Sequence, residues 1–183
     1  MRVIAGKYKS RQLKAVDSKK TRPTTDKNKE NLFNMIGPYF KGGVCLDLFG
    51  GSGGLGIEAL SRGMDELYVV DHQYKAYSII KENIASLRCE DHAHVYKMDY
   101  RKALNQFSEE KIKFNLVLLD PPYHMGVNKD IIMFLYQNDM LDDECIIVVE
   151  DEKEEAITLD EPFYLKKRQF YGKTVIQIFR FEV

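Results

Sequence analysis

Cysteine is scarce in this chain of 183 residues, and its three copies, Cys45, Cys89 and Cys145, lie far apart. An odd number of separated cysteines offers neither a disulfide framework nor a C-x-x-C motif. Long apolar runs are also missing, because the run from Cys145 to Val149 is far shorter than the ~18 residues of a membrane span. The first residues contain no apolar stretch of the length that a secretory signal needs. We therefore expect a cytoplasmic protein that does not cross a membrane.

A disordered chain is also excluded, because 44% of the residues are apolar and 30% are charged, as in ordinary folded proteins. The net charge of −1 hides an uneven distribution. Residues 1–29 hold ten basic and two acidic side chains, whereas the remainder holds 17 basic and 26 acidic ones. A basic arm on an acidic body is typical of a segment that binds a polyanion, and the alternative is a solvated surface stretch.

Strand-like and helical segments alternate along most of the chain. An N-terminal pair of short strands is expected at 2–5 and 12–16, followed by a helix from about 26 to 36 that Thr25 or Asp26 can cap. Further strands are expected at 44–49, 67–71, 93–98, 114–119 and 145–149, with helices at 55–61, 74–87, 101–107 and 129–136. Continuous apolar strands separated by helices indicate a parallel sheet covered on both faces. Two strand-like runs at 164–170 and 174–181 have no helix between them, which predicts an antiparallel pair.

A glycine-rich loop, Gly50-Gly51-Ser52-Gly53-Gly54-Leu55-Gly56, follows the first strand of this series. Glycines allow a sharp turn and a close approach to a ligand. Asp71 ends the next strand, where a carboxylate can accept hydrogen bonds from ribose hydroxyls, so we expect an adenosine-containing cofactor. The spacing of the glycines also matches G-x-G-x-x-G, so a dinucleotide cofactor remains an alternative. Asp47, inside the strand, is an unfavourable neighbour for the negatively charged pyrophosphate of a dinucleotide. It favours the ammonium and sulfonium groups of S-adenosylmethionine.

A second motif, Asp120-Pro121-Pro122-Tyr123, follows the strand at 114–119. The prolines remove two backbone donors, which leaves the Asp120 carboxylate and the Pro121 carbonyl as acceptors. Two acceptors suit the two hydrogens of an exocyclic amino group, and Tyr123 offers a flat face for the base. The predicted catalytic residues are therefore Asp120, Pro121 and Tyr123. A proline turn that closes a strand is the alternative.

Taken together, these motifs resemble the class I S-adenosylmethionine-dependent methyltransferases, and most of all the bacterial 16S ribosomal RNA guanine-N2 methyltransferases of the RsmD type. The resemblance covers nearly the whole chain, through the segments 2–9, 21–26, 46–49, 56–63, 120–123 and 171–174. It implies a Rossmann-like α/β fold: a seven-stranded, mostly parallel sheet with an antiparallel last strand, and an N-terminal β-hairpin arm (1–25) on a methyltransferase domain (26–183).

The resemblance also implies a reaction and the residues that serve it. A methyl group would pass to N2 of one guanine in 16S rRNA, within a small-subunit ribosomal particle. The implied cofactor residues are Asp47, Phe49, Gly50, Gly51, Ser52, Gly53, Asp71, Asp99 and Tyr100. The charge pattern adds candidate RNA-binding residues in the basic arm: Arg2, Lys7, Lys9, Arg11 and Arg22. The family usually has alanine at positions 51 and 54 and commonly glutamate at position 71, where this chain has two glycines and an aspartate.

Several alternatives stay open at this level. One is methylation of another amino group, such as adenine N6 in DNA or RNA. Others are an NAD-dependent oxidoreductase and a non-catalytic RNA-binding module. We expect no metal site, because the pair His92 and His94 lacks further ligands at a helpful spacing. The acidic run from Glu150 to Glu155 is interpreted as a solvated strand end.

Overall fold

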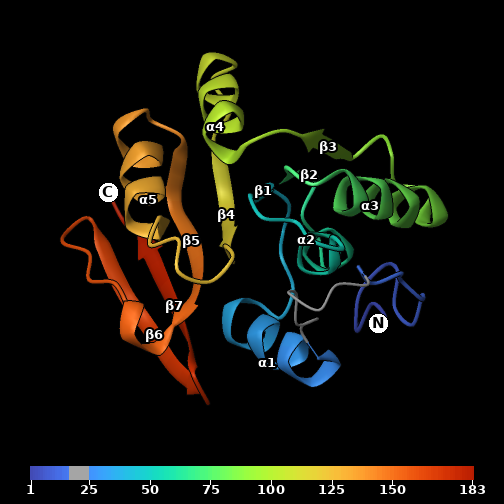
Figure 1. Ribbon diagram of the computed structural model, residues 1–183, viewed down its shortest axis with the longest axis horizontal. Coiled ribbons are helices and arrows are strands. Elements are labelled where there is room, and N and C mark those ends of the chain that lie inside the picture. Colours follow the sequence, from blue (N-terminus) through green and yellow to red (C-terminus); the bar gives the residue numbers. More distant parts are fainter. Residues whose placement is uncertain (17–24) are drawn as a thin grey trace.

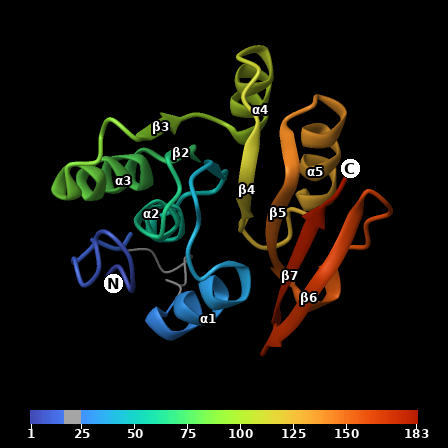
Figure 2. The same cartoon turned by 180° about the vertical axis from the view of Figure 1, so that it is seen from behind.

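The structure is a computed structural model that describes residues 1–16 and 25–183. Within these residues, seven strands form one sheet in the order β3-β2-β1-β4-β5-β7-β6 (Figures 1 and 2). The strands are β1 (Val44–Asp47), β2 (Glu66–Asp71), β3 (Ala93–Lys97), β4 (Phe114–Leu119), β5 (Leu141–Glu152), β6 (Phe163–Tyr171) and β7 (Thr174–Phe181). The helices are α1 (Asp26–Ile36), α2 (Gly54–Ser61), α3 (Tyr74–Leu87), α4 (Tyr100–Glu109) and α5 (Asn128–Gln137), with a short 3₁₀ turn η1 (Lys153–Glu155).

Strand direction follows the sequence pattern. Strands β1 to β5 are parallel, and β7 runs antiparallel to both of its neighbours, β5 and β6. The predicted seven-stranded, mostly parallel sheet with an antiparallel last strand is confirmed. Strand β1 lies between β2 and β4, so the chain changes direction across the sheet at β1, and parallel α/β sheets bind ligands beside such a switch point.

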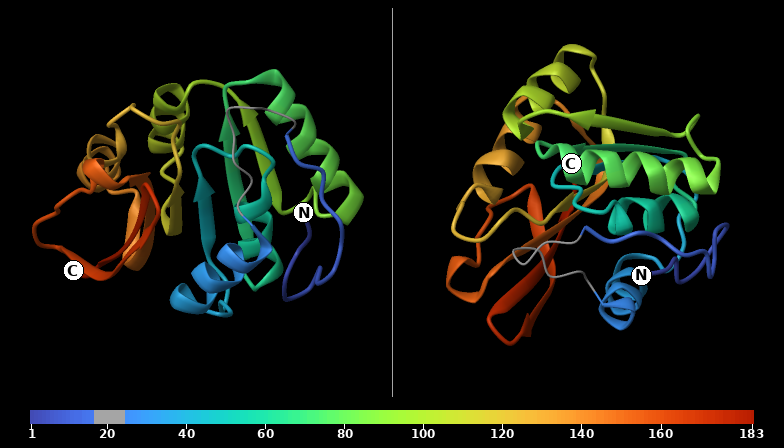
Figure 3. Two further views of the ribbon diagram at one scale, coloured as in Figure 1. Left: turned by 60° about the horizontal axis from the view of Figure 1, so that its bottom comes forward. Right: turned by 45° about the vertical axis from the view of Figure 1, so that its right-hand side comes forward.

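Helices lie on both faces of the sheet (Figure 3), and an apolar cluster fills the space on each face. Leu32, Ile57 and Ile80 bring α1, α2 and α3 onto one face. Phe107 and Ile132 bring α4 and α5 onto the other face. The strands at the centre contribute to both clusters, which explains why their sequences are almost continuously apolar.

The boundaries of α1 follow from its end residues. Thr25 Oγ1 accepts a hydrogen bond from the N–H of Asn28 at 3.1 Å, as expected for an N-cap. The N–H of Gly37 bonds to the carbonyl of Phe33 at 2.8 Å and closes the helix. Among the described residues, no helix combines the length and apolarity that crossing a membrane requires.

The N-terminal β-hairpin is not formed as expected. Residues 2–5 and 12–16 run antiparallel, but they share one isolated bridge, between Arg2 and Gln12, instead of two regular strands. Only Val3 and Leu13 of this segment are buried. The N–H groups of Ile4, Ala5, Lys7 and Tyr8 bond to Glu58 and Ser61 of α2, and the N–H of Lys14 bonds to Asn83 of α3. These backbone groups are therefore not available to a regular ladder. We refer to residues 1–16 as the N-terminal arm.

Candidate active site

The glycine loop after β1 has a conformation that requires glycine at several positions. Gly51 and Gly53 have φ angles of 59° and 84°, in the left-handed region. A Cβ at Gly50 would lie 2.6 Å from Val69 Cγ2, too close for any side chain. A Cβ at Gly51 would meet nothing within 4 Å. The loop therefore packs tightly against the sheet on one side and borders open space at Gly51.

Asp71, at the end of β2, fixes the glycine loop. Its Oδ2 accepts a hydrogen bond from the N–H of Gly51 at 2.9 Å, and its Oδ1 accepts one from the N–H of Gln73 at 3.0 Å. Each oxygen keeps a further lone pair for another donor. The structure thus brings together two predicted cofactor residues and gives Asp71 an ordering role that the sequence pattern did not reveal.

Asp47, at the end of β1, is a buried carboxyl group with only 3% of its surface exposed. Burial raises its pKa to about 7, although hydrogen bonds from the backbone of Gly56 and Phe49 act in the opposite direction. In the described part of the chain, no cation forms an ion pair with it. A buried carboxyl group beside a ligand loop, without a cationic partner, is suited to a ligand that brings a positive charge.

Asp99 and Tyr100 lie at the start of α4. Asp99 caps this helix, and its hydrogen bonds with Arg101 lower the pKa of the Asp99 carboxyl. The ring of Tyr100 lies 5.4 Å from that of Phe49, centroid to centroid. Four strand ends, those of β1, β2, β3 and β4, thus carry predicted site residues on one edge of the sheet.

The Asp120–Tyr123 loop follows β4 on the same edge and borders a small pocket. The lining residues are Asp120, Pro121, Pro122, Tyr123, Gly126, Glu150, Asp151, Glu152 and Glu155. We call this the acceptor pocket. Burial, and then the neighbouring Glu150, Asp47 and Asp151, raise the pKa of Asp120 well above its ordinary value. The Tyr123 side chain is exposed at the mouth.

The acidic run from Glu150 to Glu155 is not a solvated strand end, so that interpretation is wrong. Asp151 is 8% exposed, and its Oδ1 accepts a hydrogen bond from Asn128 Nδ2 at 2.7 Å. Its Oδ2 has no hydrogen-bond partner among the described residues. Burial raises the pKa of Asp151 to about 6 and also raises that of Glu150. The run forms one wall of the acceptor pocket because β5 lies next to β4, and a single sequence does not reveal this neighbour.

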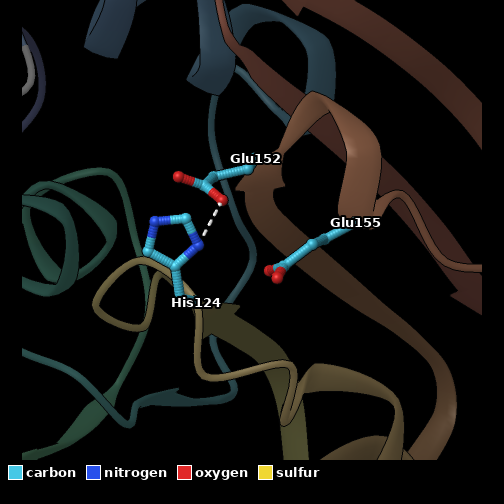
Figure 4. Close-up of side chains that lie close together, drawn as sticks. All are labelled: His124, Glu152 and Glu155. Carbon is cyan, nitrogen blue, oxygen red and sulfur yellow. Dashed lines mark ion pairs between the residues drawn. The ribbon is translucent and has the colours of Figure 1, made fainter.

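His124 lies close to Glu152 and Glu155, two residues that line the acceptor pocket (Figure 4). Its Nδ1 lies 3.0 Å from a carboxylate oxygen of Glu152, and possible ligand atoms of the three side chains lie within 4.8 Å of one another. No second feature of the described residues indicates a metal here, and we interpret the group as an ion pair. His94 instead lies 3.3 Å from Glu66, on the outer strands of the sheet.

A buried ionic cluster that the sequence analysis missed attaches the N-terminal arm to α2. Glu58 is fully buried, with Arg62 Nε at 2.7 Å and Lys29 Nζ at 3.5 Å from its carboxylate. The same carboxylate accepts hydrogen bonds from the N–H groups of Ile4 and Ala5, at 2.9 and 3.1 Å. One charged residue in the otherwise apolar sequence of α2 was the available signal.

Lys29 must therefore be removed from the basic surface that the charge count suggested. Its side chain is 1% exposed, its ammonium group donates to the carbonyl of Arg2 at 2.6 Å, and burial lowers its pKa. Lys7 and Lys9, two of the predicted RNA-binding residues, are exposed. Arg2 is also exposed but pairs with Asp26 at 3.1 Å, and Arg11 donates to a backbone carbonyl of α3. The predicted RNA-binding residue Arg22 lies outside the described residues.

Asn83, on α3, joins the N-terminal arm to the glycine loop. Its Oδ1 accepts from the N–H of Lys14 at 2.8 Å, and its Nδ2 donates to the carbonyl of Lys14 at 2.9 Å. The same Nδ2 group donates to the carbonyl of Ser52 at 2.9 Å. Ser52 was predicted to bind cofactor, whereas nothing in the sequence singled out the buried Asn83.

The sheet order, with a glycine loop after β1, an acid after β2 and Asp-Pro-Pro-Tyr after β4, defines a Rossmann-like methyltransferase. More particularly, the chain belongs to the family described as "Conserved hypothetical protein 95", whose model matches residues 1–180. The expected RsmD-type resemblance is confirmed by curated relatives that carry the name ribosomal RNA small subunit methyltransferase D.

The relatives are similar over almost their full lengths. YlbH of Bacillus subtilis strain 168 is 44% identical over 98% of each chain. Ribosomal RNA small subunit methyltransferase D of Haemophilus influenzae is 34% identical, over 94% of this chain and 89% of the relative. The solved structure of yhhF from Escherichia coli gives a TM-score of 0.87 at 31% identity, over 100% of this chain and 98% of that one. The solved structure of SMU.776, described as a putative methyltransferase complexed with SAH, has the same fold, with a TM-score of 0.65 at 11% identity over 83% of this chain and 49% of that one.

Proposed function

We propose that the protein transfers a methyl group from S-adenosylmethionine to the exocyclic N2 of a guanine in 16S ribosomal RNA. The observation that carries this proposal is the acceptor pocket at the switch-point edge, where Asp120 and Pro121 lie and where Asp47, the residue that ends β1, is near enough to raise the pKa of Asp120. The names of the relatives support ribosomal RNA as the substrate, and a small-subunit particle is the proposed form of it. Such a substrate implies that the protein acts in the cytoplasm.

The residues at the ends of β1 and β2 fit this cofactor. S-adenosylmethionine, when bound, supplies an electrophilic methyl group on a cationic sulfonium centre. The buried Asp47 carboxyl group suits a positive charge, and the free lone pairs of Asp71 suit ribose hydroxyls. Open space next to Gly51 leaves room for a ligand against the backbone. We assign Phe49 and Tyr100, whose rings are in contact, to the adenosine side of the site.

Asp120 and Pro121 would hold the target amino group by its two hydrogens. Since an aromatic amine donates its lone pair into the ring, this alignment directs the nitrogen at the methyl group. When the new N–C bond forms, N2 loses one proton, and Asp120 accepts it. Its raised pKa makes the ionised carboxylate a stronger base than an ordinary aspartate. Tyr123, exposed at the mouth, offers its ring to the base.

The acidic wall of the acceptor pocket favours guanine over adenine. On guanine, the N2 amino group lies next to N1–H, so neighbouring positions are both hydrogen-bond donors. On adenine, the N6 amino group lies next to N1, which is an acceptor. A carboxylate can only accept hydrogen bonds, so the carboxylates of this wall match the guanine edge and oppose the adenine edge.

The test is methyl transfer from labelled S-adenosylmethionine to 16S rRNA and to small-subunit particles from a strain that lacks the enzyme. Nucleoside analysis of the digested product should find the label in N2-methylguanosine. Label in N6-methyladenosine would replace the guanine assignment with the adenine alternative. Transfer to neither RNA form would exclude the ribosomal substrate.

Cofactor affinity should increase with pH because of Asp47. With a pKa of about 7, the carboxyl group is mostly protonated at pH ~6 and mostly ionised at pH ~8. A cationic ligand favours the ionised form, so affinity for S-adenosylmethionine should rise about tenfold over this range. Below pH ~7, binding should release a proton, which calorimetry in buffers of different ionisation enthalpy measures. Asp47→Asn should remove the pH dependence, and a flat profile for the unmodified protein would contradict the assignment.

We assign residues 1–25, which include the N-terminal arm, to an RNA-binding segment and residues 26–183 to the methyltransferase domain.

Replacing Lys7, Lys9 and Arg11 by glutamine should weaken RNA binding and reduce the slope of log K against log salt by about 2, since each phosphate contact contributes ~0.7–0.9. Cofactor affinity should not change. The control replaces Lys41 and Lys102, which are exposed elsewhere. Equal slopes for the arm variant and the unmodified protein would assign RNA binding to another face.

A further inference from the structure

A large apolar ring lies in solvent beside the acceptor pocket. Phe170, on the edge strand β6, is 51% exposed, although burying a phenylalanine side chain is worth ~1.5–3 kcal/mol. The ammonium group of Lys153 lies 5.6 Å from the centroid of its ring. A cation next to an exposed aromatic face is a combination that binds the base and the phosphate of single-stranded nucleic acid.

Backbone contacts fix this ring near the pocket. Phe170 is next to the last residue of β6, Tyr171, and the turn Gly172-Lys173 joins β6 to β7. The carbonyl of Lys173 accepts a hydrogen bond from the N–H of Lys153 at 2.8 Å. Lys153 directly follows Glu152, which lines the acceptor pocket. The ring and the two lysines therefore lie next to the wall that Glu152 contributes to the pocket. They belong to the β5–β6–β7 part of the sheet (Figure 1).

The charges of Lys153 and Lys173, at the rim of the acidic acceptor pocket, complement those of RNA. Among residues 1–16 and 25–183, no ion pair joins Lys153 or Lys173 to a carboxylate. Two cations without such partners, next to an acidic pocket, can hold phosphates at the rim while the carboxylates accept from a base inside. A protein partner of ordinary composition would have no matching arrangement for basic side chains around an acidic pocket.

We propose that Phe170, Lys153 and Lys173 form a subsite for the nucleotide next to the target guanine. The proposal rests on the proposed function. An enzyme that modifies a base inside a pocket must separate it from its neighbours, so one neighbouring base loses a stacking partner. The Phe170 ring replaces that partner, and the two lysines bind the adjoining phosphate.

The test compares kinetic constants with 16S rRNA for Phe170→Ala and Phe170→Tyr. Loss of one stacked base should raise KM for the RNA about tenfold in the alanine variant, and the tyrosine variant should restore it. Affinity for S-adenosylmethionine should not change. Tyr164→Ala is the matched control, because Tyr164 is also an exposed aromatic on β6 with a lysine over its ring, at 5.8 Å. Tyr164 pairs with Arg180, toward the opposite end of β6 from the hairpin turn.

A second measurement identifies the ligand. Once nucleoside mapping has located the target guanine, RNA fragments that are abasic on its 5′ or 3′ side replace the intact fragment. On one of the two, Phe170→Ala should cause no further loss, because the stacked base is already absent. Equal losses on all three fragments, or equal effects of Phe170→Ala and Tyr164→Ala, would overturn the subsite. If the unmodified protein transfers methyl to no RNA, the proposed function fails first, and the subsite fails with it.

Discussion

Replacing Asp120 by alanine is expected to lower the rate of methyl transfer about 100- to 10,000-fold, the range for removal of a positioned proton acceptor. The variant loses one of the two acceptors for the target amino group and the base that takes up its proton. The loss should occur in the chemical step, so single-turnover experiments with saturating RNA and cofactor measure it directly. Affinity for S-adenosylmethionine should change little, since the assigned cofactor residues lie on β1, on the loop that follows it, at the end of β2 and at the start of α4.

Two further variants make this expectation sharp. Asp120→Asn keeps an acceptor oxygen but cannot take up the proton, so its rate should lie between those of the alanine variant and the unmodified protein. The control is Asp142→Ala, at an exposed position near the start of β5. Its single-turnover rate should equal that of the unmodified protein. A single-turnover rate near that of the unmodified protein for Asp120→Ala would refute the proposed role of the loop.

Replacing Glu58 by alanine should have the largest effect on stability. The substitution leaves Lys29 and Arg62 buried without their carboxylate, and breaking a buried ion pair in this way destabilises proteins by ~3–5 kcal/mol. It also removes the acceptors of the Ile4 and Ala5 N–H groups, so the N-terminal arm should loosen. Denaturant unfolding measures the first effect, and amide exchange at Ile4 and Ala5 measures the second.

The matched control is Glu109→Ala, an exposed glutamate on α4. Substitutions at such positions usually change the free energy of unfolding by less than ~0.5 kcal/mol. If Glu58→Ala unfolded at the same denaturant concentration as this control, the buried cluster would contribute nothing to stability. Its three charges would then serve only to position the arm.

The sheet and its helices could be predicted because their signals are local. The expected helix at 74–87 and strand at 114–119 agree with α3 and β4, since each is a clear apolar pattern between polar ends. Strand β5 begins at Leu141, before the expected 145, because Leu141 pairs with Phe114. The three acidic residues that follow Leu141 conceal this start in the sequence. The N-terminal hairpin was wrong for a related reason: the arm bonds to α2 and α3, which lie far away in sequence.

The same distinction separates the predicted site from the missed residues. The glycine loop and Asp120–Tyr123 are continuous segments, so their composition reveals them. Asn83 bonds to Lys14 and Ser52, which are 69 and 31 residues away in sequence. Glu58 bonds to the backbone of Ile4 and Ala5, which are 54 and 53 residues away. The burial of Asp151 depends on α5, through Asn128. Such roles arise from tertiary contact and leave little trace in a single sequence.

The three hydrogen bonds of Asn83 have a thermodynamic consequence. One amide group binds both the arm, at Lys14, and the glycine loop, at Ser52, so the order of either segment favours the order of the other. A nucleic acid that immobilises the arm thereby lowers the entropy that a cofactor must remove from the loop. Linkage is reciprocal, so a loop filled by the cofactor strengthens the hold of the arm on its ligand by the same factor. With RNA on the arm and S-adenosylmethionine on the loop, as proposed, we expect the two substrates to bind with positive heterotropic cooperativity, transmitted through a single buried asparagine.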